Sequence, residues 1–146
     1  MTTYSTLLLY LCKKIKTRMD AILSIKPIYA NQILAGTKKV EFRKRSFKEK
    51  VRRVYIYSSM PVKQIVGYFT FSDIDEDTPA NLWQKYQEVG GIAKEDFFSY
   101  YANNASGCAL VIKSVTPFKQ GKSPNIFVED FVAPQSYIYL DDREAN

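Results

Sequence analysis

Residues 35–45 are Ala35-Gly36-Thr37-Lys38-Lys39-Val40-Glu41-Phe42-Arg43-Lys44-Arg45, and a single carboxylate lies there among five positively charged side chains. Successive residues of a strand point to opposite faces, so Val40 and Phe42 would share one face and the odd-numbered positions the other. The odd-numbered positions are Lys39, Glu41, Arg43 and Arg45. Two interpretations are open: the charged face is merely solvated, or it meets an anion that Glu41 recognises or acts upon.

The preceding residues predict a strand and a short helix. Ile22, Leu23 and Ile25 predict a short buried strand. Pro27 suits the first position of a helix, and Gly36 suits the left-handed residue that ends one. Lys26 and Lys38 then fall near opposite ends of this helix, where both could border one cleft.

Four separated motifs follow one another along the chain. They are Ser24-Ile25-Lys26-Pro27; Gly36-x-Lys38-x-x-Glu41-Phe42-Arg43-Lys44-Arg45; Val54-Tyr55-Ile56-Tyr57-Ser58-Ser59-x-Pro61-Val62 with Ile65-Val66-Gly67-Tyr68-Phe69; and Ala133-Pro134-Gln135-Ser136-Tyr137. In this order, over residues 19–140, they resemble the ASCH domain of the PUA-like superfamily. The resemblance implies an α+β fold: a small mixed β-barrel with helices packed on its outside.

The resemblance also implies two kinds of function. ASCH domains are regarded mainly as RNA-binding modules with a site between barrel and helices. Some small relatives deacetylate acetylated cytidine with a Gly-x-Lys-Thr-x-Thr-x-Arg arrangement, and others cleave RNA. Here Gly36, Lys38 and Arg43 match that arrangement, but Lys39 and Glu41 occupy the two threonine positions, so the hydroxyl of the amidohydrolase chemistry is missing.

Composition fits one globular domain. The chain has 146 residues, of which 46% are hydrophobic and 25% charged, values typical of a folded protein with its own core. Its two cysteines, Cys12 and Cys108, suggest no disulfide framework. It has no histidine, which excludes Ser-His-Asp and Cys-His nucleophiles and histidine metal ligands. We expect no metal and no cofactor.

Charge is divided unevenly along the chain. Residues 1–54 carry a net charge of +11 and residues 55–146 a net charge of −5. One positive face is therefore expected, and phosphate backbones are common partners of such a face. A solubility gradient without a partner, or an acidic protein partner, would fit the same distribution.

The first eighteen residues are unlike the rest. Residues 7–12 are apolar but too few to span a membrane, and the basic cluster follows them, whereas in a secretory signal it comes first. We interpret 1–18 as an extension, with Met19 as the natural start, 19–140 as the domain and 141–146 as a polar tail. A small amphipathic helix that docks on the barrel or on a membrane surface is the alternative for the extension.

Later segments predict the remaining elements. Strands are expected at 54–57, 65–71, 109–115 and 135–140, and helices after Thr78 and at 93–102, with a bend at Gly67. Trp83 has the helical spacing of a core residue. Asp73, Asp75, Glu76 and Asp77 lack the spacing of a calcium loop and predict an acidic loop that caps the next helix.

These patterns predict a cytoplasmic domain without a membrane segment that binds RNA, a nucleotide or a modified nucleobase in a basic cleft. The expected binding residues are Lys26, Lys39, Arg43, Arg45, Tyr57, Ser58, Ser59, Gln135 and Ser136, with Tyr57 as a base-stacking ring. The alternative is a hydrolase, either a deacetylase or a ribonuclease, in which Lys38 and Glu41 are catalytic. Lysine becomes a base or nucleophile when burial or nearby cations lower its pKa, and a carboxylate serves as a general acid or base.

Overall fold

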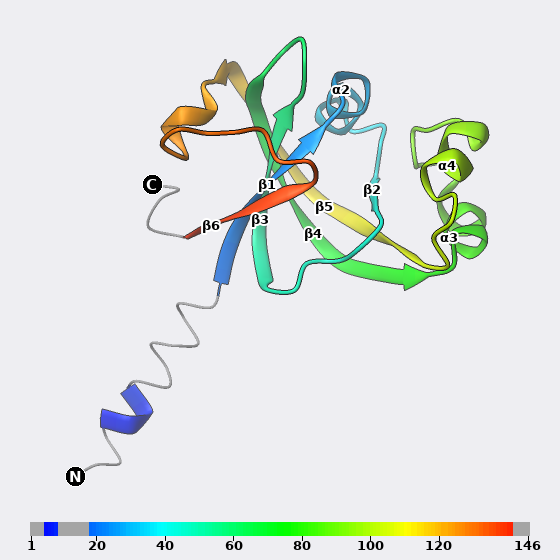
Figure 1. The fold of residues 1–146 in the computed structure, drawn as a ribbon, viewed down its shortest axis with the longest axis horizontal. Coiled ribbons are helices and arrows are strands. Elements are labelled where there is room, and N and C mark those ends of the chain that lie inside the picture. Colours follow the sequence, from blue (N-terminus) through cyan, green and yellow to red (C-terminus); the bar gives the residue numbers. More distant parts are fainter. Residues whose placement is uncertain (1–4, 9–17, 142–146) are drawn as a thin grey trace.

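The computed structural model describes residues 5–8 and 18–141 (Figure 1). Its strands are β1 (Arg18–Ile25), β2 (Val40–Arg43), β3 (Lys50–Ser58), β4 (Gln64–Asp77), β5 (Gly107–Lys122) and β6 (Tyr137–Asp141). Its helices are α2 (Pro27–Ala35), α3 (Pro79–Tyr86), α4 (Lys94–Tyr100) and the 3-10 turn η1 (Pro124–Ile126). The predicted α+β class is confirmed. No helix in the described ranges is long and apolar enough to cross a membrane.

The strands form one open sheet in the order β2-β5-β4-β3-β1-β6. β1 pairs with β3 in parallel, and the other pairs are antiparallel. The expected closed barrel is not confirmed, since β2 and β6 are the two edges of the sheet. The loop after β2 links them by side chains instead: the Phe47 ring lies 4.9 Å from that of Tyr137, and the Tyr139 hydroxyl accepts a 2.9 Å hydrogen bond from the Lys48 N–H.

Helix α2 begins and ends as its sequence predicts. Pro27 is its first residue, and Gly36 follows it at φ 82°, a left-handed conformation that glycine adopts without strain. Ala30 and Ile33 are fully buried against the sheet. The main core cluster consists of Ala21, Leu23, Ile25, Ala30, Ile33, Val54, Ile56, Phe69 and Leu110.

A second core cluster lies between β2 and the helices α3 and α4, on the right of Figure 1. Its buried members are Val40, Phe42, Leu82, Phe97, Tyr101 and Ala109. Trp83 is partly buried and packs on Phe97 with ring centroids 5.2 Å apart, so it borders this core, on the side that its helical spacing predicted. Phe98 is the aromatic residue of α4 that stays exposed.

Gly67 occupies an irregular position in β4, as predicted. The β4–β5 register shifts between Ile65 and Gly67, and a Cβ at Gly67 would lie 2.6 Å from the Thr116 carbonyl oxygen. The strand expected at 109–115 is longer than predicted, because Gly67 pairs with Pro117 and β5 continues to Lys122. A residue without a side chain lets the two backbones approach where proline interrupts the ladder.

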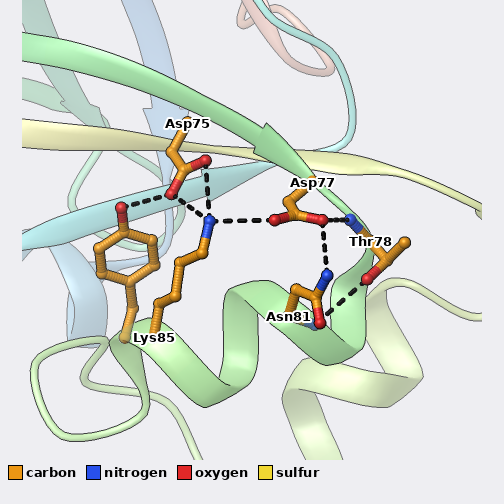
Figure 2. A network of polar contacts seen from close by, with 6 residues as sticks. Asp75, Asp77, Thr78, Asn81 and Lys85 are labelled. Atoms are coloured by element: carbon orange, nitrogen blue, oxygen red, sulfur yellow. Dashed lines mark hydrogen bonds and ion pairs between the residues drawn. The ribbon is translucent and has the colours of Figure 1, made fainter.

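The acidic residues 73–77 belong to β4, so the prediction of an acidic loop was wrong. Helix α3 begins after Thr78 as predicted, and the Thr78 hydroxyl caps it by accepting from the Asn81 N–H at 3.2 Å. Of the acidic residues, Asp77 takes part at this helix start, because its carboxylate accepts from the Thr78 N–H and the Asn81 amide. Figure 2 shows the polar network that joins β4 to α3 around Asp75, Asp77 and Lys85. In the described parts of the chain, no group of three or more His, Cys, Asp or Glu side chains could hold a metal ion.

The domain boundaries remain predictions. Most of the 1–18 extension and of the tail lies outside the described residues. Residues 5–8 are described as helical and are exposed.

Candidate functional site

Lys38 and Glu41 are buried, with exposed fractions of 3% and 6%. Of the two interpretations left open for the charged face of β2, a merely solvated face does not fit the buried Glu41. The reason is that α2 and the segment carrying α3 and α4 cover this edge strand: the Lys38 ammonium donates to the Gly90 carbonyl oxygen, and its Nζ lies 5.2 Å from the ring centroids of both Tyr29 and Phe42.

Burial sets the protonation behaviour of Lys38. Loss of solvent lowers the pKa of its ammonium below the ordinary value, and attraction to Glu41 opposes this decrease. A lysine of lowered pKa is a stronger proton donor when charged and is more often available as a neutral base. The desolvated lysine that this chemistry requires is thus present.

Three buried polar atoms near Lys38 and along β2 have no hydrogen-bond partner. They are Gln32 Oε1, Glu41 Oε2 and Arg43 Nε. Most buried polar atoms in proteins are paired, and each one left unpaired is costly. Two acceptors and one donor on neighbouring elements form a set that a polar ligand could complete.

Gln32 belongs to this site through the backbone as well. Its carbonyl oxygen accepts hydrogen bonds from the N–H groups of Thr37 (3.0 Å) and Lys38 (3.1 Å). Gly91 has φ 66°, and a Cβ there would lie 2.0 Å from Gln32 Oε1 and 3.3 Å from Lys38 Cβ. The Gly90-Gly91 turn therefore approaches Gln32 and Lys38 as only glycine permits.

Arg43 joins β2 to the segment that precedes β6. Its Nη2 donates to the Ser136 hydroxyl at 2.7 Å, and its Nη1 lies 3.5 Å from the Ser24 carbonyl oxygen. Its own carbonyl oxygen accepts from the Tyr101 hydroxyl at 2.9 Å. The structure thus brings together Arg43 and Ser136, which the sequence predicted as binding residues 93 positions apart.

Two tyrosines border these charges. Burial, with smaller contributions from Asp96 and Glu41, raises the pKa of Tyr29. Burial also raises the pKa of Tyr100, and Arg43 opposes that increase. Both hydroxyls stay protonated at neutral pH and can donate hydrogen bonds. We call the set Tyr29, Gln32, Lys38, Glu41, Arg43, Tyr100 and Ser136 the β2-edge site.

The other predicted residues are not members of the β2-edge site. Tyr57 is buried and packs on Phe131 at 5.0 Å, so its predicted role as a base-stacking ring is corrected: protein covers the ring. Ser58 is buried in β3, with an exposed fraction of 2%, and Ser59 is half-buried. Besides Ser136, the exposed predicted residues are Lys26, Lys39, Arg45 and Gln135.

The comparisons with known proteins decide the family. The ASCH domain family matches residues 23–119. The chain belongs to the ASCH domain family. An ASCH domain-containing ribonuclease from Zymomonas mobilis is 26% identical over 133 residues, which cover 89% of this ASCH chain and 90% of that protein. Large ribosomal subunit protein uL22 from Ureaplasma parvum is 28% identical over 111 residues, 75% of this chain and 36% of its own length.

The fold of this ASCH domain also resembles a solved structure. The crystal structure of ASCH from Zymomonas mobilis matches with a TM-score of 0.79 at 24% identity, covering 88% of this chain and 91% of that one. Lys38, Glu41 and Arg43 of the β2-edge site lie in one of the motifs by which the sequence resembled the family, and Ser136 lies in another. The site's other members, Tyr29, Gln32 and Tyr100, were not predicted, because nothing in the residues themselves distinguishes them from ordinary helix positions.

Proposed function

We propose that this ASCH domain binds single-stranded RNA at the β2-edge site. The observation that carries the proposal is the group of buried, unpartnered polar atoms on Glu41 and Arg43 beside the desolvated Lys38. A guanidinium suits phosphate oxygens, and an ionised carboxylate accepts from the exocyclic amine of a base, which Lys and Arg cannot do. The net charge of +11 in residues 1–54 supports an anionic ligand.

Binding of a fluorescent twelve-nucleotide RNA tests this proposal. Arg43→Gln should weaken binding about tenfold and flatten its salt dependence, because a phosphate contact is lost. Arg43→Lys should weaken binding by an intermediate factor, because lysine keeps the positive charge but cannot form the bidentate hydrogen bonds of a guanidinium. Lys113→Gln, an exposed change on β5, is the control and should bind within about twofold of wild type. No binding by wild type, or equal binding by Arg43→Gln, would overturn the proposal.

A second candidate function is RNA cleavage at the same site. Two observations favour it: the lowered pKa of Lys38 beside a carboxylate, and the relative named a ribonuclease. Glu41 would take the proton of a ribose 2′-hydroxyl, whose oxygen attacks the phosphorus. The Lys38 ammonium would protonate the departing 5′-oxygen, and Arg43 would neutralise charge on the phosphoryl oxygens. The products would be a 2′,3′-cyclic phosphate and a 5′-hydroxyl end.

The RNA substrate itself can be varied to test cleavage. An oligonucleotide with 2′-deoxyribose throughout lacks the nucleophile and should stay intact, whereas the matched RNA should give cyclic phosphate ends. Glu41→Gln should lower the rate about a hundredfold and change base preference more than affinity. Unchanged cleavage in Glu41→Gln would reject this assignment without affecting the binding proposal. Acetylated cytidine serves as a comparison substrate, since nothing in the structure favours the deacetylase over the ribonuclease.

A further inference from the structure

A hollow of about 550 Å³ lies beyond the C-terminal end of β2 and does not include Lys38 or Glu41. Its lining comes from three segments that follow β2, end β4 and begin β5. The lining residues are Lys44, Arg45, Ser46, Glu76, Asp77, Thr78, Ser106, Gly107 and Cys108. Its volume is within the range of about 300–1,000 Å³ that small-molecule sites occupy.

The hollow adjoins the β2-edge site. Cys108 pairs with Arg43 in the β2–β5 ladder, and the Tyr101 hydroxyl donates to the carbonyl oxygens of both residues. The Lys44 ammonium lies 5.0 Å from the ring centroid of Tyr100. Two residues of extended chain span about 7 Å, so Lys44 and Arg45 lie within about two stacked nucleotides of Arg43.

The side chains of the hollow combine both signs of charge. Lys44 and Arg45 are exposed and follow β2, while Glu76 and Asp77 end β4. Asp77 is already engaged: its carboxylate accepts from Thr78 N–H, the Asn81 amide and the Lys85 ammonium (Figure 2).

Glu76 is the acid of the hollow that remains available. Among the described residues its carboxylate makes no hydrogen bond or ion pair. The negative charge of this carboxylate contributes to raising the pKa of the Cys108 thiol. That pKa is raised to about 11, mainly by burial, so the thiol is unreactive at neutral pH. The hollow therefore offers binding groups, namely cations and one free carboxylate, but no nucleophile.

We infer that this hollow binds a second nucleotide of the same RNA strand, next to the nucleotide held at the β2-edge site. Lys44 and Arg45 contact its phosphate, and the Glu76 carboxylate accepts a hydrogen bond from an exocyclic amine of its base. A nucleotide carries both the anion and the donor that these side chains match. This inference rests on RNA binding at the β2-edge site and extends it along the strand.

Affinity as a function of RNA length tests the inference. The probes are a nucleoside 5′-monophosphate, too short to occupy both sites, and a nonanucleotide, and every 2′-hydroxyl is methylated so that no in-line cleavage can occur. Lys44→Gln/Arg45→Gln should weaken nonanucleotide binding about tenfold and lower the slope of log affinity against log salt by about 1.4. Mononucleotide binding should change less than about twofold. Lys113→Gln/Lys119→Gln removes the same charge from exposed positions of β5 and is the control.

Base preference gives a second readout. Glu76→Gln should reduce the preference for amine-bearing bases over uracil in the nonanucleotide and leave the mononucleotide preference unchanged. The inference is overturned if the Lys44/Arg45 variant matches the control or loses affinity equally for both lengths. It also fails if Glu76→Gln leaves every preference intact. If wild type binds neither RNA, the proposed function fails and this inference fails with it, which is a different result from normal wild-type binding with an unaffected variant.

Discussion

Two lysine–carboxylate clusters in this molecule have opposite properties. Lys85 lies on α3 and contacts Asp75 and Asp77 of β4, each at 3.0 Å, and all three side chains are partly exposed (Figure 2). Lys38 and Glu41 are almost fully buried, and Glu41 Oε2 has no partner. The first cluster has its hydrogen bonds satisfied within the protein. The second leaves acceptors open.

The pKa directions of the two lysines express the same difference. Hydrogen bonds, first to Asp77 and then to Asp75, raise the pKa of Lys85, whereas burial lowers the pKa of Lys38. A lysine whose charge is stabilised holds two elements together. A lysine whose charge is destabilised is suited to proton transfer or ligand contact. Both clusters contain lysine and carboxylate side chains, so residue type does not distinguish them. What distinguishes the structural cluster from the candidate site is whether the polar atoms already have hydrogen-bond partners within the protein.

The largest effect expected is on RNA cleavage. Lys38→Met should lower the cleavage rate by about a hundredfold or more, because it removes the proposed proton donor. Lys85→Met makes the same change in the exposed cluster and should leave the rate within about twofold. Rates under single-turnover conditions, with melting temperatures for both variants, provide the measurement. Equal losses in the two variants would remove the functional distinction between the clusters.

A smaller effect is expected at two left-handed glycines. The Cβ added by Gly36→Ala has no atom within 4 Å. This variant should therefore lower stability by about 1–2 kcal/mol through backbone strain alone and retain RNA binding. Gly91→Ala has the same strain, and in addition its Cβ displaces the Gln32 side chain beside Lys38. We expect it to weaken RNA binding as well. Denaturant unfolding and RNA titration measure both, and normal binding by Gly91→Ala would show that Gln32 is outside the site.

The pH dependence of stability should differ between wild type and Lys38→Met. The folded-state pKa of Lys38 is below its ordinary value of 10.5, so between these two values the unfolded chain binds more protons than the folded chain. Wild-type stability should therefore rise relative to Lys38→Met as pH increases through that window. Denaturant melts of the two proteins up to pH 10.5 measure the difference, and parallel curves would contradict the burial effect.

The smallest effect is expected at Asp77. Its hydrogen bonds to Asn81, Lys85 and the Thr78 N–H lower its pKa from 3.8 to about 2. The stabilisation is complete above the unfolded value and is lost as pH falls from about 4 to about 2. Asp77→Asn should therefore lose less stability than wild type as pH falls through that window. Melting temperatures at stepwise lower pH test this, and identical profiles would mean that the exposed network contributes little.

The fold was predictable from local chemistry at several positions. Pro27 and Gly36 bounded α2, Thr78 capped α3, and Gly67 marked the irregular part of β4, because each depends on backbone geometry that few residues provide. The open sheet was not predictable from the strand patterns, which are alike in an open sheet and a closed one. Only the pairing order shows that β2 and β6 are edges.

The sequence singled out residues of the candidate site but did not predict their environment. Charge pattern and family resemblance pointed to Lys38, Glu41 and Arg43, and the structure brings the three together; their function remains a prediction. Their burial was missed, because strand alternation describes the direction of a side chain and not what another element places over it. Tyr57 was misjudged for the same reason: Phe131, 74 positions later, covers its ring.

Hydrogen bonds from the α3–α4 segment cover backbone groups at both ends of the edge strand β2. The Val89 carbonyl oxygen accepts from the Lys39 N–H at 2.8 Å, and the Tyr101 hydroxyl donates to the Arg43 carbonyl oxygen at 2.9 Å. An open sheet has two edges, and an uncovered edge strand is a template on which another chain can add and start aggregation. The segment that carries α3 and α4 occupies polar backbone atoms at this edge, and β2 is four residues long. Shortening that segment should uncover these backbone atoms and leave an edge strand on which another chain can pair, so the segment beside the candidate site also shields one edge of the sheet.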